Sequence, residues 1–215
     1  QNFPCRLLTA GASQAGAGEL TKLMAAAPAA LEAAETTADD AAFWLYTSGS
    51  TGVPKAVVHL HRSPIQTAVL YGQRVLRIGS SDRIFSAAKM FFAYGLGNSM
   101  TFPFSVGATS IVSACRPTPE NVLSVIDLVS PTVFCGVPTI YHNLLALPGI
   151  DEASCLAAVR LYLSAGEPLP EQIGRQWQTL SGRELIDGLG TTEMLQTFLS
   201  NQPGEVRYGS TGVAV

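Results

Sequence analysis

Strand-like and helix-like segments alternate along the chain from residue 83 to residue 186, and this alternation restricts the fold more than any other feature. Apolar runs typical of strands occupy residues 83–88, 109–113, 131–137, 159–164 and 184–186. Helical patterns lie between them, at residues 118–129, 138–147 and 170–180, and open on Thr118-Pro119, Pro138 and Pro170. Gly182 is the expected C-terminal residue of the last of these helices. Such an alternation produces right-handed crossovers between parallel strands. We therefore expect an α/β fold, a mostly parallel sheet with helices on both faces.

The part of the chain before residue 83 shows weaker patterns. Residues 20–27 predict a short helix, and residues 32–40 predict an exposed linker. The apolar run at residues 41–46 predicts a buried strand. Ser63-Pro64 offers an N-cap and a first helical residue for a further helix.

Composition and charge narrow the class of protein. The 215 residues are 47% apolar, which is enough for one large domain or two small ones. Only 13% are charged, and the net charge is −3 with no basic run, so a nucleic-acid partner is not expected. The four cysteines form no CxxC pair, which predicts reduced thiols and a cytoplasmic location. No apolar run approaches the ~20 residues of a membrane span, so a membrane partner is not expected either.

A segment rich in hydroxyl groups and glycine follows the strand expected at residues 41–46. Residues 46–56 read Tyr-Thr-Ser-Gly-Ser-Thr-Gly-Val-Pro-Lys-Ala. Glycine lets the backbone approach a ligand closely, and consecutive N–H groups with an ammonium group form an anion-binding loop. The spacing differs from a Walker A loop, which has four residues between its glycines and Ser or Thr after its Lys. The segment predicts a phosphate loop of another kind; the alternative is a polar surface turn.

A second glycine-rich segment follows the last expected strand. Residues 187–194 read Asp-Gly-Leu-Gly-Thr-Thr-Glu-Met, so two hydroxyl groups precede a carboxylate. Mg²⁺ is commonly held by one or two protein carboxylates together with substrate phosphates. The segment therefore predicts a loop for phosphate and metal. The alternative is the N-terminus of a helix, with Thr191 or Thr192 as its cap and Glu193 favourable to the helix dipole.

Two further segments also follow expected strands. Residues 164–170 read Ser-Ala-Gly-Glu-Pro-Leu-Pro, a turn before a helix. Residues 88–98 contain three aromatic residues and two glycines, which predict the wall of an apolar pocket. Ordinary core packing is the alternative for this stretch. Ligands of α/β folds gather at the carboxyl ends of strands, where all four segments are expected.

Together these segments resemble the acyl-adenylate-forming superfamily, which includes acyl-CoA ligases, luciferases and the adenylation domains of peptide synthetases. Residues 47–55 match its phosphate-loop pattern Thr-Ser-Gly-Ser/Thr-Thr-Gly-x-Pro-Lys at every position, and residues 190–193 match its Gly-x-Thr-Glu ending. Residues 92–98 and 187–195 are similar to benzoate-CoA ligases and other aryl-CoA ligases. The resemblance covers nearly the whole chain.

The resemblance implies roles for individual residues. Lys55, Thr192 and Glu193 would be catalytic, and Glu193 would also hold the metal. The ATP site would consist of Thr47, Ser48, Gly49, Ser50, Thr51, Gly52, Lys55, Ala165, Gly166, Glu167, Pro168, Asp187, Gly188 and Thr192. The Asp187 backbone oxygen would meet the adenine amino group. The acid pocket would consist of Ala93, Tyr94, Gly190, Gln196 and Thr197.

The function that the resemblance implies is ATP-dependent conversion of an aromatic carboxylic acid to aryl-AMP and then aryl-CoA. ATP, Mg²⁺ and coenzyme A would be the cofactors. Benzoate-CoA ligases usually carry His and Ile where this chain has Gln196 and Thr197. Because buried polar groups need partners, we expect a hydroxy- or aminobenzoate rather than benzoate itself. Two alternatives stay open: a nucleotide-binding module without ligase activity, and an enzyme that loads a carrier protein.

The chain begins without Met and ends in an apolar run, and we expect it to be an internal segment of a longer protein. Residues 1–42 would be a truncated lead-in with an Ala-rich linker. Residues 43–215 would be the central AMP-binding region of the large N-terminal domain. By resemblance, the C-terminal lid domain with its catalytic Lys would be absent, so little or no ligase activity is expected of the isolated chain.

Two histidines stand two residues apart after the predicted phosphate loop. His59 and His61 would face the same side of a strand, an arrangement that could bind a metal. A protein zinc site needs three or four ligands, and no third is evident. Structural roles are therefore expected for both.

Overall fold

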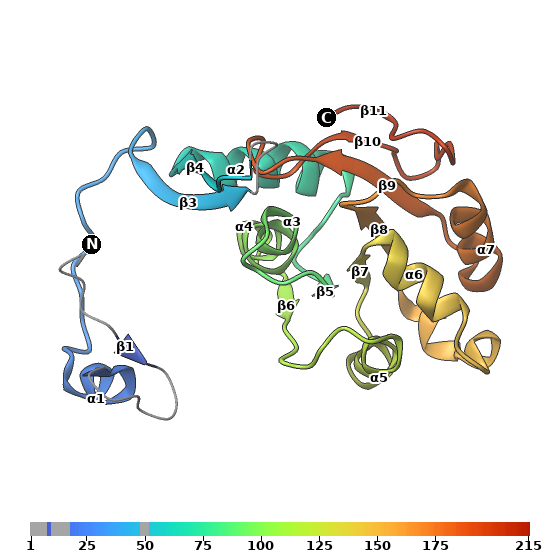
Figure 1. Ribbon diagram of the computed structural model, residues 1–215, viewed down its shortest axis with the longest axis horizontal. Coiled ribbons are helices and arrows are strands. Elements are labelled where there is room, and N and C mark those ends of the chain that lie inside the picture. The colour runs from blue at the N-terminus through green and yellow to red at the C-terminus, as the bar shows by residue number, and fades with distance from the viewer. Residues whose placement is uncertain (1–7, 10–17, 48–51) are drawn as a thin grey trace. The chain divides into compact units, whose positions relative to one another are not determined.

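The computed structural model describes residues 8–9, 18–47 and 52–215 (Figure 1). The chain divides into two compact units, Gln1–Thr36 and Thr37–Val215. The first unit contains two parallel strands, β1 (Leu8–Thr9) and β2 (Gly18–Glu19), and the helix α1 (Leu20–Ala26). This helix confirms the expectation for residues 20–27, and residues 32–40 are exposed, as predicted for the linker.

The second unit is built around a seven-stranded sheet of order β11-β10-β9-β8-β7-β5-β6 (Figure 1). Its strands are β5 (Arg83–Ser86), β6 (Thr109–Ile111), β7 (Val133–Gly136), β8 (Leu161–Ala165), β9 (Leu185–Gly190), β10 (Thr197–Ser200) and β11 (Val213–Ala214). The strands from β5 to β9 pair in parallel, which confirms the expected mostly parallel sheet. Strands β10 and β11 extend it in antiparallel pairing, which the sequence did not predict.

Helices pack on both faces of this sheet, as expected. One face carries α5 (Pro119–Val129), α6 (Pro138–Leu145) and α7 (Glu171–Ser181), which contribute Val122, Tyr141 and Trp177 to the core. The other face carries the π-helical segment η1 (Ala68–Val75) and α4 (Phe102–Val106), which contribute Tyr71 and Phe102. Two short 3₁₀ helices, η3 (Ile150–Glu152) and η4 (Ser154–Ala158), precede β8.

Three fully buried aromatic side chains form the centre of the first face. The rings of Tyr141, Tyr162 and Trp177 meet edge to face, with centroids 4.8, 5.1 and 6.4 Å apart. The Tyr141 hydroxyl donates to the Leu163 carbonyl at 2.7 Å, and the Tyr162 hydroxyl donates to the Leu156 carbonyl at 2.6 Å. Such ring pairs contribute about 0.5–1.5 kcal/mol beyond their burial, so the cluster anchors α6 and α7 to β8.

Local signals in the sequence set several helix boundaries. The Thr118 Oγ1 accepts the Asn121 N–H at 3.3 Å and caps α5, whose first residue is Pro. Gly182 ends α7 with a φ of +68°, the left-handed conformation that favours glycine. The prediction of Ser63 as an N-cap was wrong, because α2 (Arg62–Thr67) begins at Arg62 and already includes Ser63. The Ser63 Oγ instead accepts the Leu60 N–H at 3.3 Å.

Strands β3 (Ala41–Thr47) and β4 (Lys55–Leu60) form an antiparallel hairpin that is separate from the large sheet. The strand predicted at residues 41–46 is confirmed by β3, but its predicted burial was wrong, since Trp44 is 62% exposed and Tyr46 is 70% exposed. The alternate residues of β3, Phe43 and Leu45, are partly covered. The run is apolar on both faces, and an apolar run by itself does not show which face is covered.

A continuous helical stretch occupies residues 93–106, where the sequence predicted only a pocket wall. It consists of α3 (Ala93–Leu96), η2 (Gly97–Thr101) and α4. Glycine disfavours helices, which hides the helix from propensity arguments. Here glycine serves close packing: a Cβ at Gly97 would collide with the Gln196 side chain, and a Cβ at Gly95 would collide with the Lys89 carbonyl.

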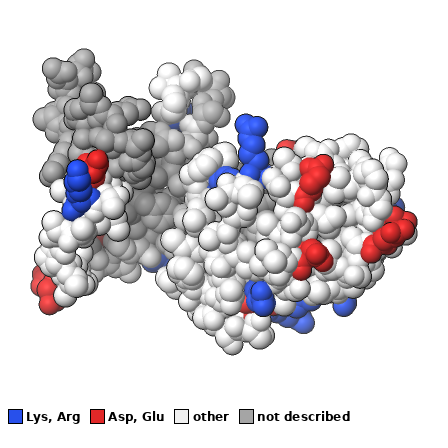
Figure 2. Space-filling model, turned by 90° about the horizontal axis from the view of Figure 1, so that it is seen from below, with Lys and Arg blue, Asp and Glu red and all other residues white. Residues whose placement is uncertain are grey.

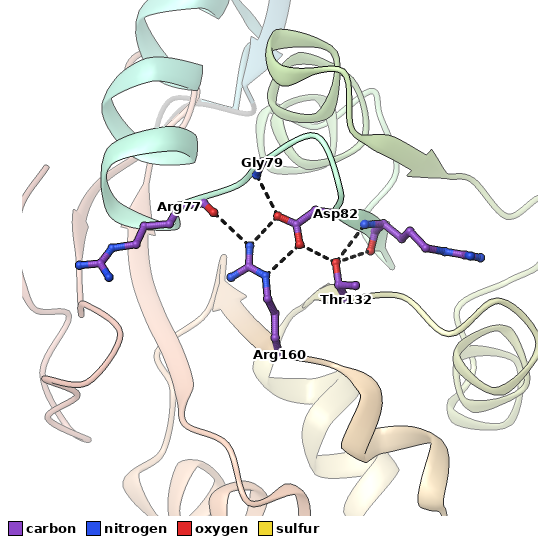
Figure 3. A network of polar contacts seen from close by, with 6 residues as sticks. Arg77, Gly79, Asp82, Thr132 and Arg160 are labelled. Carbon is purple, nitrogen blue, oxygen red and sulfur yellow. Dashed lines mark hydrogen bonds and ion pairs between the residues drawn. The ribbon is translucent and has the colours of Figure 1, made fainter.

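An ion pair joins the loops at the amino ends of three parallel strands (Figure 3). Asp82 accepts Arg160 Nε at 2.8 Å and Nη2 at 2.6 Å, the Gly79 N–H at 2.9 Å and the Thr132 hydroxyl at 2.7 Å. Burial by itself would raise the pKa of Asp82, but the hydrogen bonds from Arg160, Gly79 and Thr132 outweigh it and hold the pKa below its ordinary value. The network therefore stabilises the starts of β5, β7 and β8 relative to one another.

The face shown in Figure 2 carries few charged side chains, in keeping with the charged fraction of 13%. Among the described residues, no helix combines the length and apolarity needed to cross a membrane. Cys115, Cys135 and Cys155 are free thiols, and Cys5 lies outside the described residues.

Candidate functional site

The connection order of the large sheet reverses once, and this creates a place for a ligand. From β5 the chain crosses to β6 on one side and then returns past β5 to β7, β8 and β9 on the other. In open α/β sheets, ligands bind outside the carboxyl ends of strands where the connections diverge in this way. A cleft of about 390 Å³ lies at these carboxyl ends.

The cleft brings together half of the residues that the sequence predicted for the site. Its lining consists of Thr47, Phe92, Ala93, Tyr94, Ala165, Gly166, Gly190, Thr191, Thr192, Glu193, Gln196 and Thr197. The whole predicted acid pocket is included, together with Thr47, Thr192 and Glu193 from the predicted phosphate and metal site. The predicted residues that do not line the cleft are Gly52, Lys55, Glu167, Pro168, Asp187 and Gly188. The predicted Ser48, Gly49, Ser50 and Thr51 lie outside the described residues. Phe92 and Thr191 were not predicted individually.

The hairpin places Lys55 beside Thr47, a residue of the cleft lining. Thr47 and Lys55 stand opposite each other in the register of β3 and β4. Directly opposed residues of an antiparallel pair project from the same face, and Thr47 lines the cleft. Lys55 is exposed and is the first residue of β4 rather than a residue of the loop. Gly52 has a φ of +76°, which glycine adopts without strain.

A tight turn presents Thr192 and Glu193. The Thr192 carbonyl accepts the Leu195 N–H at 3.1 Å, and the Thr191 Oγ1 accepts the Met194 N–H at 3.1 Å. Leu195 has a φ of +65°, in the left-handed region, so the backbone reverses there. No helix begins at this point, so the alternative of a capped helix N-terminus was wrong. Glu193 is exposed at the cleft, where its carboxylate is open to a ligand.

His59 connects the hairpin to this turn. Its side chain is 4% exposed, and its Nε2 lies 2.9 Å from the Thr192 carbonyl oxygen. The Phe43 ring lies beside it, with centroids 5.3 Å apart. His61 lies outside β4 and is exposed. Among the described residues there is no group of three or more His, Cys, Asp or Glu side chains suited to hold a metal.

The polar side chains of the predicted acid pocket already have partners inside the protein. The Gln196 Oε1 accepts the Thr197 N–H at 3.1 Å and the Thr197 hydroxyl at 3.3 Å. The Gln196 Nε2 donates to the carbonyls of Ala93 and Tyr94, each at 3.4 Å. Both Gln196 and Thr197 are buried. Neither side chain therefore depends on a ligand for a hydrogen-bond partner.

Two features shape the rest of the pocket. A Cβ on Gly190 would lie 2.9 Å from the Gln196 carbonyl oxygen, so glycine permits the close approach of two backbone segments. The Tyr94 hydroxyl is buried and has no hydrogen-bond partner among the described residues. Burial raises the pKa of Tyr94 well above its ordinary value, so this phenol stays protonated.

The segment after β8 lies beside the turn. Ala165 and Gly166 line the cleft, and Gly166 has a φ of +91°, which requires glycine. The next residue, Glu167, points to α6, where its Oε2 accepts the Thr139 hydroxyl at 2.6 Å. The cleft thus receives the backbone of this segment, while the Glu167 side chain serves to hold the segment in place.

The sequence predicted that Asp187 opens a loop. This prediction was wrong, because β9 continues through Gly190. Its carbonyl accepts the Asn201 N–H at 2.9 Å, which links it to the antiparallel neighbour of β9. The side chain is 6% exposed, and its Oδ1 has no hydrogen-bond partner among the described residues. Burial raises the pKa of Asp187 to about 6.

Comparison with known proteins finds relatives along the whole chain. A family model described as AMP-binding enzyme matches residues 7–215. The chain is 50% identical to a benzoate–CoA ligase from Thauera aromatica over 93% of this chain and 38% of that protein. Its fold matches the crystal structure of a benzoate CoA ligase from Burkholderia xenovorans LB400, with a TM-score of 0.88 and 46% identity over 99% of this chain and 42% of that one. It also matches the anthranilate CoA ligase AuaEII in complex with anthranoyl-AMP, with a TM-score of 0.90 and 37% identity over 97% of this chain and 40% of that one. The chain thus spans about two fifths of the length of these relatives.

Proposed function

We propose that this chain, which belongs to the family of AMP-binding enzymes, is part of a ligase that activates an aromatic carboxylic acid with ATP and passes the acyl group to coenzyme A. The observation that carries the proposal is the composition of one cleft of about 390 Å³. Residues proposed for phosphate and metal line the same cavity as residues proposed for the acid. A cavity of this kind can align a carboxylate with a phosphorus atom, and alignment supplies much of the rate of such a reaction.

The proposed first step is attack of a carboxylate oxygen of the acid on the α-phosphorus of ATP. The bond between that phosphorus and the bridging oxygen of pyrophosphate breaks, and aryl-AMP forms. The Thr192 hydroxyl contacts the α-phosphate, and the Lys55 ammonium with Thr47 and residues 48–51 holds the β- and γ-phosphates. In the second step the thiolate of coenzyme A attacks the acyl carbon, and AMP leaves. Neither step uses a covalent nucleophile of the chain, so charge stabilisation and positioning are its tasks.

Glu193 is the residue proposed to hold Mg²⁺. It presents a single carboxylate to the cleft, which fits an ion that shares its coordination sphere with nucleotide phosphates and water. When bound, the ion offsets the negative charge that develops on the phosphate oxygens. The chain's own contribution is the hydrogen-bonded turn from Thr191 to Leu195, which holds the backbone of Glu193 at the cleft.

The acid proposed is benzoate or a hydroxy- or aminobenzoate. The relatives described above are benzoate and anthranilate CoA ligases, which supports this class. Gln196 and Thr197 already have hydrogen-bond partners within the protein, so they give no separate argument for a polar ring substituent. ATP, coenzyme A and the acid are small molecules of the cytoplasm, and the proposed location is cytoplasmic.

The experiment that tests the proposal is acid-dependent ATP–pyrophosphate exchange by the full-length enzyme. The acids are benzoate, the three hydroxybenzoates, anthranilate and acetate, and ATP binding is measured separately by calorimetry. Exchange with an aromatic acid, absent with acetate, is the expected result. ATP binding without exchange for any acid would overturn the ligase proposal in favour of a nucleotide-binding module.

A matched pair of variants tests the site. Glu193→Gln removes the proposed metal ligand, and we expect at least a tenfold loss of exchange. Glu171→Gln changes an exposed carboxylate on α7 that lies outside the cleft, and exchange should stay unchanged. Equal rates for the two variants would contradict the role proposed for Glu193. Product analysis with coenzyme A present or absent then separates thioester formation from transfer to a carrier protein.

A further inference from the structure

We infer that His59 is a positioning residue for the turn that carries Thr192 and Glu193. In this inference its Nε2–H fixes the orientation of the peptide bond between those two residues. The inference rests on the proposed function, because that function assigns phosphate contact to Thr192 and metal binding to Glu193. His59 itself is proposed to touch neither nucleotide nor acid.

The contact joins two parts of the chain that are distant in sequence. His59 lies in β4 and Thr192 lies after β9, 133 residues further on, yet the Nε2–oxygen distance is 2.9 Å. A carbonyl oxygen only accepts hydrogen bonds, so the His59 Nε2 carries the hydrogen and donates it. The side chain is 4% exposed, which shields this bond from competing water.

The acceptor is a key atom of the turn. The Thr192 carbonyl already closes the turn by accepting the Leu195 N–H at 3.1 Å, and His59 adds a second donor to the same oxygen. Among the described residues, His59 is the side chain from outside the turn that donates to it. This carbonyl belongs to the peptide plane that joins Thr192 to Glu193. A rotation of that plane would redirect both side chains, and two donors oppose such a rotation.

The ring of His59 is itself held in place. Phe43 is its partner in the register of β3 and β4, and the two rings lie 5.3 Å apart with a tilt of 36°. The hairpin that carries Thr47 and Lys55 therefore also carries the donor that orients the Thr192–Glu193 turn. One consequence is that the two proposed phosphate-binding segments are aligned by the protein before the nucleotide arrives, rather than by the nucleotide.

Substitutions of His59 separate donation from packing. In His59→Gln the side-chain Nε2 can replace the ring Nε2 as a donor, whereas His59→Phe keeps an aromatic ring but has no donor. His61→Phe is the matched control, because His61 is exposed and lies two residues further along the same segment. Each full-length variant is compared with the wild type by calorimetric titration with ATP at several Mg²⁺ concentrations and by ATP–pyrophosphate exchange.

We expect His59→Phe to weaken Mg²⁺-dependent ATP binding by roughly tenfold, the loss that is typical when a residue supporting a metal ligand is removed. The same variant should raise the Mg²⁺ concentration for half-maximal exchange, and His59→Gln should restore both values to within about threefold. His61→Phe should match the wild type. Binding in the absence of Mg²⁺ should differ little between the variants.

The outcomes separate this inference from the proposed function. If the wild type binds ATP and catalyses exchange, and His59→Phe does both equally well, the inference is overturned and the proposed function stands. Equal losses in His59→Phe and His59→Gln would also overturn it, because packing and not donation would then be responsible. Absence of Mg²⁺-dependent ATP binding in the wild type would overturn both.

Discussion

Removal of the Asp82 carboxylate is the perturbation whose cost the structure defines best. Asp82→Ala leaves Arg160 Nε and Nη2, the Gly79 N–H and the Thr132 hydroxyl without their shared acceptor. Breaking a buried ion pair from one side typically costs about 3–5 kcal/mol. The Arg160 side chain is 39% exposed, so water compensates part of its loss, and we expect about 3 kcal/mol, the lower end of this range. For a domain of this size that corresponds to a fall in Tm of about 6–12 °C.

The assay is urea unfolding of wild type and variant, with thermal unfolding beside it. Glu171→Ala is the matched control, because it breaks an ion pair to Arg175 whose side chains are 66% and 52% exposed, and such pairs contribute at most about 0.5 kcal/mol. A loss for Asp82→Ala no larger than that for Glu171→Ala would refute the reasoning. It would mean that the network in Figure 3 contributes no more than a solvated pair.

The pH dependence of the same variant has a definite sign. The pKa of Asp82 is lower in the folded protein than its ordinary value of 3.8. Its contribution to stability is therefore complete above pH ~4 and is lost as the pH falls through the folded-state pKa. The stability difference between wild type and Asp82→Ala should shrink below pH 4. A difference that grows on acidification would contradict the assignment.

Three further predictions concern the site and the core. The pKa of Asp187 is raised by burial from 3.8 to about 6, so its favourable contribution exists below pH ~4 and is lost as the pH rises through 6. Asp187→Asn should then raise the free energy of unfolding by about 1 kcal/mol at pH 8, after discounting for solvent screening, and leave it unchanged at pH 4; urea unfolding at both pH values checks this. Gly190→Ala places a Cβ 2.9 Å from the Gln196 carbonyl oxygen, so the KM for the acid in exchange should rise at least about tenfold, and an unchanged KM would count against the pocket. Trp177→Ala empties the aromatic cluster beside Tyr141 and should cost about 3–5 kcal/mol in urea unfolding, whereas a cost below 2 would mean that the core repacks.

Sequence predicted those parts of the fold whose signals are local. The cap at Thr118 and the left-handed Gly182 lie within a few residues of the helix ends that they determine, so both could be inferred. The reversal after Thr191 could not, because it depends on Leu195, a residue type that rarely adopts a positive φ. For the same reason the return through β10 and β11 was missed, and β9 was ended too early.

In the candidate site, too, the local signals could be recognised in the sequence and the distant contacts could not. Its motifs were recognisable because each one follows a strand and carries hydroxyl groups, glycine or a carboxylate in a short span. The hydrogen-bond partners of individual side chains were not recognisable. The Gln196 side chain accepts the N–H of the next residue, and the His59 ring contacts a carbonyl oxygen 133 residues further along the chain. A residue's polarity can be read from sequence, but its partner depends on which distant backbone the fold brings near. The exposure of Trp44 is a further case, because covering one face of a hairpin is a tertiary event.

The contact between His59 and Thr192 also limits when the cleft can form. A ribosome adding roughly 5–20 residues per second needs on the order of ten seconds to make the 133 residues between them. Throughout that interval the residues of the hairpin have been made but those of the turn have not, and contacts between such distant residues form late in folding. The cleft therefore assembles only after residue 192 and the residues that follow it in the lining have been made. A ligand that binds the assembled cleft would therefore report that the hairpin and the turn have come together, not merely that each has been made.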